Sequence, residues 1–155
     1  MKILFLDFDG VVNSGAYREN FELYEANPIE PQKLELIKRI ADETSAKIVL
    51  TSTWRKFWRE DGPQDNEKGI LIERLFGDCG LKVCSKTPEL DFFCRDKEVK
   101  AWLESNPEAE AYCVLDDLSE FFEEPSVKEH LVLTNSETGI TEEDVSKAIG
   151  ILNEK

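Results

Sequence analysis

The sequence predicts an α/β fold, a three-layer α/β/α sandwich in which helices cover both faces of a mainly parallel sheet. Short apolar runs at residues 2–6, 47–50 and 111–115 are typical of strands that are buried on both faces. Segments with apolar residues at helical spacing lie between these runs, so strands and helices alternate along the chain. The 155 residues, of which 41% are hydrophobic, are enough for the core of a single domain that spans 1–155.

The first half of the chain begins with a strand and a long polar stretch. Pro28 and Pro31 mark the end of that stretch, and Leu34, Ile37 and Ile40 then recur at the spacing of one helix face. The elements expected here are, in order, a strand over 2–6, a helix over 32–43, a strand over 47–50 and a short helix over 54–60.

The second half continues the alternation. Apolar spacing at Ile72 and Phe76 predicts a helix that ends near Gly77 or Gly80, and Asp96 is expected to cap the next helix. The remaining elements expected are strands over 82–84, 111–115 and 131–133, and a last helix that begins at Thr141 with a capping box formed with Asp144.

The charge of the chain limits its function. Aspartate and glutamate outnumber lysine and arginine by 33 to 19, which gives a net charge of −14 at pH 7. Such an excess argues against a protein that binds nucleic acid or anionic membranes non-specifically, because these proteins need a basic face. It is compatible with a small basic pocket for one phosphate group, and a carboxylate-rich site attracts a divalent cation.

No apolar run in the sequence approaches the roughly 18 residues of a membrane-spanning helix. The apolar start stops at Asp7, too early for a secretory signal, so a cytoplasmic protein with no membrane contact is expected. The cysteines include no C-x-x-C pair, and reduced thiols are expected. The one histidine, His130, is expected in a loop, which leaves acid–base chemistry to carboxylates.

Polar residues directly follow three of the expected strands. They are Asp7 and Asp9 after the first strand, Thr51 and Ser52 after the second, and Asp116 and Asp117 after the strand at 111–115. Because the carboxyl ends of parallel strands share one edge of a sheet, the four carboxylates are expected to converge there. Mg²⁺ would relieve their mutual repulsion, since it prefers oxygen ligands. The alternative, aspartate as a simple turn or capping residue, explains one cluster more easily than two aspartate pairs.

The same residues resemble motifs of the haloacid dehalogenase (HAD) superfamily. Residues 7–11, Asp-Phe-Asp-Gly-Val, resemble its first motif, D-x-D-G-[TV]; residues 48–51 resemble the second, and residues 112–117 resemble the acidic strand end of the fourth. A subgroup is similar in more detail, namely the small HAD domains of Swiss Army Knife RNA repair proteins. The segments that carry this finer resemblance are 6–14, 51–55, 98–103 and 138–141.

The resemblance implies a Mg²⁺-dependent phosphatase that works through an aspartyl-phosphate. Asp7 would be the nucleophile, and Asp9 would protonate the leaving oxygen and then activate water. Mg²⁺ would be held by the Asp7 carboxylate, the Asp9 backbone carbonyl and one aspartate of the fourth motif. Asp117 is favoured as that ligand. Asp116 is either the alternative ligand or a residue that supports the ligands without binding the metal itself.

The resemblance also implies residues that bind the phosphoryl group. Thr51 would donate its hydroxyl to the transferring oxygens, with Ser52 as a substitute and with backbone N–H groups around Gly10 and Ser52 assisting. Arg55 follows the second motif beside Trp54. It is therefore a candidate to hold a neighbouring phosphate of the substrate at the rim of the site.

The third motif of the superfamily is a lysine near the start of the helix that precedes the fourth-motif strand. This sequence has arginine at 95 and lysine at 97 in that region. Arg95 is favoured because it lies just before the expected helix, whereas Lys97 has the expected residue type and stays open. Either side chain would neutralise the charge that Asp7 shares with the phosphate.

HAD cap domains are inserted after the first motif or between the second and third. The gap at 14–30 is too short for a folded cap, and residues 56–94 must already supply a helix and a strand of the core. An open site without a cap suits a bulky phosphorylated substrate such as a nucleotide or a nucleic-acid end. The alternatives are a phosphoprotein phosphatase and a HAD-like phosphate-binding or regulatory domain without turnover. The oligomeric state stays open, with a monomer favoured.

Overall fold

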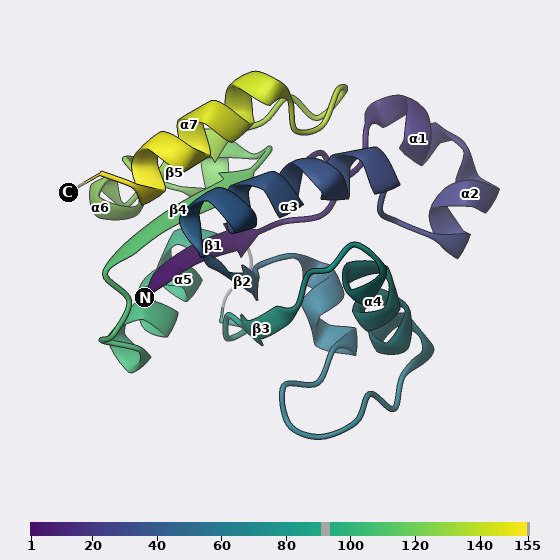
Figure 1. Cartoon of the computed structure of the whole chain (residues 1–155), viewed down its shortest axis with the longest axis horizontal. Coiled ribbons are helices and arrows are strands. Elements are labelled where there is room, and N and C mark those ends of the chain that lie inside the picture. Colours follow the sequence, from purple (N-terminus) through teal and green to yellow (C-terminus); the bar gives the residue numbers. More distant parts are fainter. Residues whose placement is uncertain (91–93, 155) are drawn as a thin grey trace.

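The computed structural model describes residues 1–90 and 94–154. Its five strands form one parallel sheet in the order β3-β2-β1-β4-β5 (Figure 1). The strands are β1 (Lys2–Leu6), β2 (Lys47–Leu50), β3 (Val83–Lys86), β4 (Ala111–Asp116) and β5 (Leu131–Leu133). The helices are α1 (Gly15–Glu19), α2 (Phe21–Ala26), α3 (Pro31–Thr44), α4 (Glu67–Asp78), α5 (Arg95–Ser105), α6 (Pro125–Lys128) and α7 (Glu142–Leu152), with 3-10 helices η1 (Thr53–Phe57) and η2 (Ser119–Phe121).

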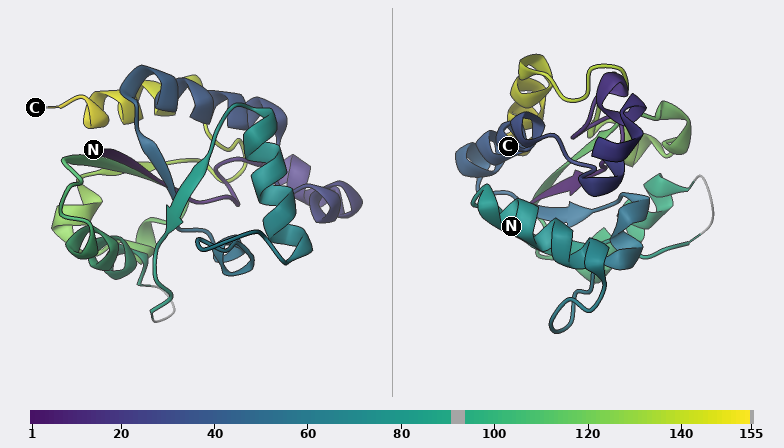
Figure 2. Two further views of the ribbon diagram at one scale, coloured as in Figure 1. Left: turned by 60° about the horizontal axis from the view of Figure 1, so that its bottom comes forward. Right: turned by 90° about the vertical axis from the view of Figure 1, so that its right-hand side faces the viewer.

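The two faces of the sheet build two separate apolar clusters. Leu4 and Leu6 of β1 point to one face, where they join side chains of α3, α4 and α7. Ile3 and Phe5 alternate with them and point to the other face, where Trp102 of α5 belongs to the cluster. Helices therefore cover both faces (Figure 2), and the three-layer α/β arrangement predicted from the apolar runs is confirmed.

The order of the strands indicates where a ligand would bind. The chain adds β2 and β3 on one side of β1 and then adds β4 and β5 on the other side. The direction of winding therefore reverses between β1 and β4. In open parallel sheets, ligands bind outside the carboxyl ends of the strands at such a reversal. The residues that directly follow β1 and β4 are the ones expected to face a ligand.

Several local predictions can be compared with the structure. The capping box of α7 is confirmed, with Thr141 as the N-cap and its partner Asp144. The prediction that Asp96 caps α5 is wrong, because Cys94 occupies the N-cap position. Asp96 lies in the first turn instead, where its Oδ2 accepts the backbone N–H groups of Glu123 and Glu124, at 3.0 and 2.9 Å, and so ties α5 to the segment before α6.

The polar stretch after β1 is more ordered than expected. It contains the short helices α1 and α2, which stand beyond the carboxyl end of β1 (Figure 1). No cap domain is seen in the described part of the chain.

Across residues 1–90 and 94–154, no helix combines the length and apolarity needed to cross a bilayer. The single domain spanning 1–155 stays a prediction.

Candidate functional site

Strand register brings the first site residues together. The Asp7 N–H donates to the Leu115 carbonyl of β4 at 3.1 Å, and the Thr51 N–H donates to the Leu6 carbonyl of β1 at 3.0 Å. Three residues at the carboxyl ends of neighbouring strands therefore lie side by side: Asp7 after β1, Thr51 after β2 and Asp116 at the end of β4. The backbone hydrogen bonds thus enforce the predicted convergence for Asp7 and Asp116. The Asp9 carboxylate, which was expected in the same cluster, is not part of it and contacts Asn13 and Tyr24 instead.

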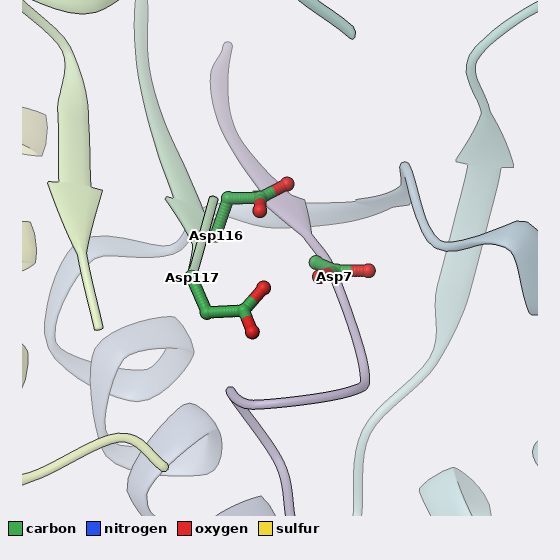
Figure 3. Close-up of side chains that lie close together, drawn as sticks. All are labelled: Asp7, Asp116 and Asp117. Atoms are coloured by element: carbon green, nitrogen blue, oxygen red, sulfur yellow. The ribbon is translucent and has the colours of Figure 1, made fainter. Parts of the chain in front are cut away.

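Three carboxylates meet at this edge (Figure 3). Asp7, Asp116 and Asp117 each offer an oxygen that lies within 4.8 Å of the other two. The side chains of Asp7 and Asp116 are almost completely removed from solvent, with 3% and 0% of their residue surface exposed. Carboxylates packed this closely repel one another unless a positive charge lies between them.

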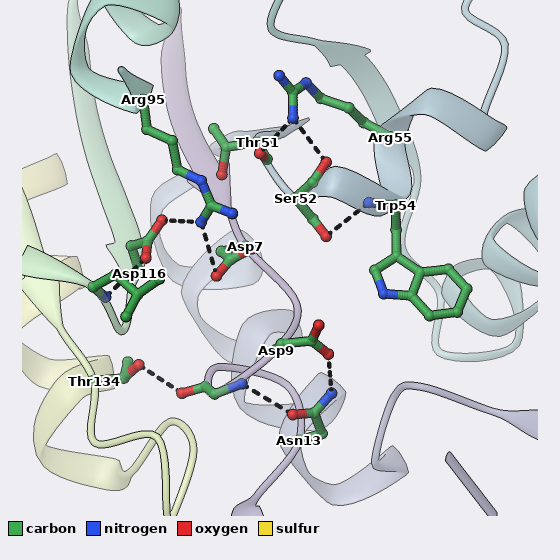
Figure 4. Close-up of polar contacts among 12 residues, drawn as sticks. Asp7, Asp9, Asn13, Thr51, Ser52, Trp54, Arg55, Arg95, Asp116 and Thr134 are labelled. Carbon is green, nitrogen blue, oxygen red and sulfur yellow. Dashed lines mark hydrogen bonds and ion pairs between the residues drawn. The ribbon is translucent and has the colours of Figure 1, made fainter. Parts of the chain in front are cut away.

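Arg95 supplies a positive charge from the first residue of α5 (Figure 4). Its Nη1 lies 3.0 Å from Asp7 Oδ2 and 2.5 Å from Asp116 Oδ2. Lys97, the other candidate for this position, is exposed and lies two residues further along the helix. Side chains at that spacing do not share a helix face, so Arg95 is the residue that α5 turns into the site.

The protonation equilibria reflect this crowding. Burial raises the pKa of Asp7 well above its ordinary value, the charge of Asp116 raises it further, and Arg95 opposes both effects. Burial also raises the pKa of Asp116 against the opposing effect of Arg95. Burial and the neighbouring Asp116 raise the pKa of Asp117 to about 6. Burial alone would lower the pKa of Arg95, but the two carboxylates that it contacts raise it above the ordinary value.

The donor set fits a magnesium ion. Three carboxylates face one guanidinium, and Arg95 pairs with Asp7 and Asp116. Among the residues that the structure describes, Asp117 makes no ion pair within 4 Å. A hard dication bound by carboxylate oxygens would compensate the charge that Arg95 leaves unbalanced. Asp7 and Asp117 are the side chains best placed to hold it.

A buried hydroxyl points to a second kind of ligand. Thr51 is 1% exposed, and in the described part of the chain its Oγ1 is the one buried side-chain polar atom without a hydrogen-bond partner. A buried hydroxyl without a partner costs about 1–3 kcal/mol, so it indicates a place for a missing acceptor. The hydroxyl of Ser52 is already used in part, because it accepts the Trp54 N–H at 3.1 Å as the N-cap of η1.

Gly10 shapes the site by its lack of a side chain. Its φ of +77° favours glycine, and a Cβ built at this position would lie 2.2 Å from Asp117 Oδ2. The Gly10 N–H donates to Asn13 Oδ1 at 2.9 Å, and its carbonyl accepts from Thr134 Oγ1 at 2.7 Å. Backbone N–H groups around Gly10 were expected to assist a phosphate, and the N–H of Gly10 itself is already engaged within the loop.

Asp9 is held from two sides. Asn13 Nδ2 donates to Asp9 Oδ1 at 3.0 Å (Figure 4), and the Tyr24 hydroxyl lies 3.0 Å from Oδ1 and 3.1 Å from Oδ2. Asn13 is completely buried and also donates to the Pro28 carbonyl at 2.7 Å. The carboxylate of Asp9 therefore has a fixed orientation although its residue is only partly buried.

The expected rim position of Arg55 is wrong. Arg55 is 4% exposed, and its Nη1 donates to the carbonyls of Thr51 and Ser52 at 2.8 and 3.0 Å. Its Nη2 binds Glu98 Oε2 of α5 at 2.7 Å. The guanidinium of Arg55 thus forms a buried clamp: its contacts with Thr51, Ser52 and Glu98 join the loop after β2 to α5. Because α5 carries Arg95, the clamp fixes the two elements that present Thr51 and Arg95.

Sequence reasoning missed several residues that shape the site. Asn13 and Glu98 lie inside segments that carry the resemblance to a known family, but the pattern gave neither a role. Tyr24 and Thr134 lie outside those segments and in no recognisable motif. Only the folded chain brings them to the loop after β1, Tyr24 through α2 and Thr134 from the end of β5.

Comparison with known proteins gives one match. The family described as the HAD domain in Swiss Army Knife RNA repair proteins matches residues 3–145. No curated protein and no solved structure matches the chain. The matched range includes every residue named in this site.

Replacing Arg55 by alanine should destabilise the fold. The change strips the Thr51 and Ser52 carbonyls of a donor and leaves Glu98 as an unpaired buried charge, so we expect a loss of about 3–5 kcal/mol in the free energy of unfolding. Arg59→Ala is the matched control, because Arg59 makes an exposed ion pair with Asp65 and should lose less than about 1 kcal/mol. Urea unfolding measures both; equal losses would contradict the clamp.

Asp117→Asn should stabilise the metal-free protein at pH 7 and change little at pH 4. The pKa of Asp117 is about 6 in the folded protein against an ordinary 3.8, so the folded state keeps a proton that the unfolded chain has released. The stability linked to that proton is present below pH 3.8 and is lost as the pH rises through about 6. Asparagine stays uncharged throughout and should gain roughly 1–2 kcal/mol at pH 7 after allowance for solvent screening.

Chemical unfolding at the two pH values in metal-free buffer measures this difference. Glu120→Gln removes an exposed carboxylate and serves as the control. Added Mg²⁺ should raise the melting temperature of the wild type at pH 7 by mass action and raise that of Asp117→Asn less. Identical pH profiles for Asp117→Asn and wild type would show that this carboxylate is not crowded.

Proposed function

We propose that this chain, which belongs to the HAD domain family of Swiss Army Knife RNA repair proteins, is a Mg²⁺-dependent phosphohydrolase that forms an aspartyl-phosphate on Asp7. One observation carries the proposal. The buried Asp7 carboxylate contacts the Arg95 guanidinium, and the neighbouring strand end carries Thr51, whose buried hydroxyl has no hydrogen-bond partner among the described residues. A nucleophile, a cation and an unused donor at one sheet edge suit the transfer of a phosphoryl group.

In the first step, an Asp7 carboxylate oxygen attacks the phosphorus atom and the bond from phosphorus to the leaving oxygen breaks. Thr51 donates its hydroxyl to a phosphoryl oxygen, and Arg95 neutralises part of the charge on Asp7. Asp9 gives its proton to the leaving oxygen. In the second step, Asp9 takes a proton from a water molecule whose oxygen attacks the aspartyl-phosphate. This step releases inorganic phosphate and restores the Asp7 carboxylate.

The metal would be held by the carboxylates of Asp7 and Asp117 and by the Asp9 backbone carbonyl. Bound there, it would reduce the repulsion between the nucleophile and an anionic substrate. Asp116 is assigned to Arg95 instead, because its Oδ2 contacts Nη1 and its Oδ1 accepts the Leu118 N–H at 3.0 Å. The two neighbouring aspartates would thus have separate partners, the metal for Asp117 and Arg95 for Asp116.

The substrate is proposed to be a phosphate at the end of a nucleic acid or on a nucleotide. The description of the family as a domain of RNA repair proteins supports this class. No cap domain covers the site in the part of the chain that the structure describes, so contacts beyond the phosphate must come from the surrounding surface. Because the net charge of the protein is −14, we expect these contacts to involve a few nucleotides at the end of a nucleic-acid strand rather than a long duplex.

The chemistry is tested by removing each carboxylate in turn. Asp7→Asn should abolish turnover, because an amide is not a nucleophile, and Asp9→Asn should lower it by roughly 10²- to 10⁴-fold. EDTA should remove the activity of the wild type, and Mg²⁺ should restore it. Turnover of a generic aryl phosphate is the measurement, with Glu120→Gln as the control. Normal activity in Asp7→Asn would disprove the covalent route.

The substrate class is tested by comparing kcat/KM across phosphate esters. We expect a phosphorylated oligonucleotide end or a nucleotide to exceed a sugar phosphate by about tenfold or more, because only the larger substrates reach contacts outside the phosphoryl pocket. A screen that also includes phosphopeptides measures the preference. The nucleic-acid assignment fails if sugar phosphates or phosphopeptides rank first.

A further inference from the structure

We infer that Tyr24 is a positioning residue for Asp9, one that fixes which carboxylate oxygen delivers the proton to the leaving group. The inference rests on the proposed function, since it concerns the same reaction. Tyr24 lies on α2, between β1 and α3 but outside the motif at residues 7–11. Its hydroxyl reaches both oxygens of Asp9, at 3.0 and 3.1 Å.

The two oxygens of Asp9 have unequal surroundings. Oδ1 accepts from Asn13 Nδ2 as well as from the Tyr24 hydroxyl, whereas among the described residues Oδ2 contacts only the Tyr24 hydroxyl. Asn13 cannot turn away, because it is buried and its Oδ1 accepts the Gly10 N–H and Arg18 Nη1, both at 2.9 Å. When Asp9 carries a proton, two donors therefore remain directed at Oδ1. The proton is left on Oδ2, which is the oxygen free to donate it.

The position of the Tyr24 ring is fixed by its packing. Its ring packs edge-on against Trp54 of η1, with ring centroids 6.3 Å apart and an angle of 83° between the planes. A phenol hydroxyl keeps its proton at neutral pH, so Tyr24 acts as a donor towards Asp9. The contact with Trp54 joins α2 to the loop after β2, so the orientation of Asp9 depends on the same loop that presents Thr51.

The test uses two esters that differ in their need for an acid. A nitrophenyl phosphate has a good leaving group that departs with little protonation, whereas an alkyl phosphate needs a proton on its leaving oxygen. The value of kcat/KM reports the step in which that oxygen leaves. Tyr24→Phe in the full chain with Mg²⁺ should lower kcat/KM for the alkyl ester by about tenfold, a part of the roughly 10²- to 10⁴-fold that an acid supplies, and change the nitrophenyl ester less than about twofold.

Tyr17→Phe is the matched control. Tyr17 lies on the adjacent α1, and its hydroxyl donates to the Asn27 carbonyl at 2.8 Å, so this variant loses a similar hydrogen bond in the same stretch without touching Asp9. It should leave the ratio between the two esters unchanged. In an Asp9→Asn background, Tyr24→Phe should have no further effect on that ratio, because the two residues act through one proton.

Three results would overturn the inference. They are equal losses on both esters in Tyr24→Phe, the same change of ratio in Tyr17→Phe, and a full additional loss when Tyr24→Phe is combined with Asp9→Asn. A wild type that hydrolyses neither ester is a different result. It would reject the proposed function itself and the role of Tyr24 with it.

Discussion

The position of Arg95 between Asp7 and Asp116 is the constraint on which the site depends. Without it, two almost completely buried carboxylates would lie beside Asp117 with no counter-charge from α5. Leaving buried charges unpaired costs several kcal/mol, so the fold must bring the first turn of α5 to the edge of β1 and β4. The ties that hold α5 there are polar as well: Glu98 binds Arg55, and Asp96 binds the backbone before α6. The helix can present Arg95 to the site because these other side chains anchor it.

Much of the fold and the centre of the site were predictable from sequence, for a physical reason. A parallel sheet buries its strands on both faces, so the strands consist of apolar runs, and the residues after them share one edge whatever the loops do. Asp7, Thr51 and Asp116 could be grouped on that basis alone. The strand order could not be derived in the same way, because it depends on long-range packing that short apolar runs do not encode.

The errors arose where side-chain direction mattered. Arg55 follows Thr51 closely and carries the right charge for a phosphate, but the tight turn of η1 points it inward to carbonyls and to Glu98. Asp96 has the residue type of a helix cap, yet the chain begins α5 one residue before it and uses the carboxylate for a distant backbone. Tyr24 could not be recognised because its contact with Asp9 is set by how α2 folds back over the loop.

The long separation in sequence between the opposing charges has a consequence for how the chain is made. Asp7 is the first of these residues to be synthesised, Asp116 follows 109 residues later, and Arg95 precedes Asp116 by 21. The growing chain can therefore pair β1 with β2 while Asp7 is the single aspartate of the cluster at that edge. The guanidinium of Arg95 leaves the ribosome before Asp116 and Asp117. The cluster of three aspartates is thus completed last, after the positively charged Arg95 has already been synthesised.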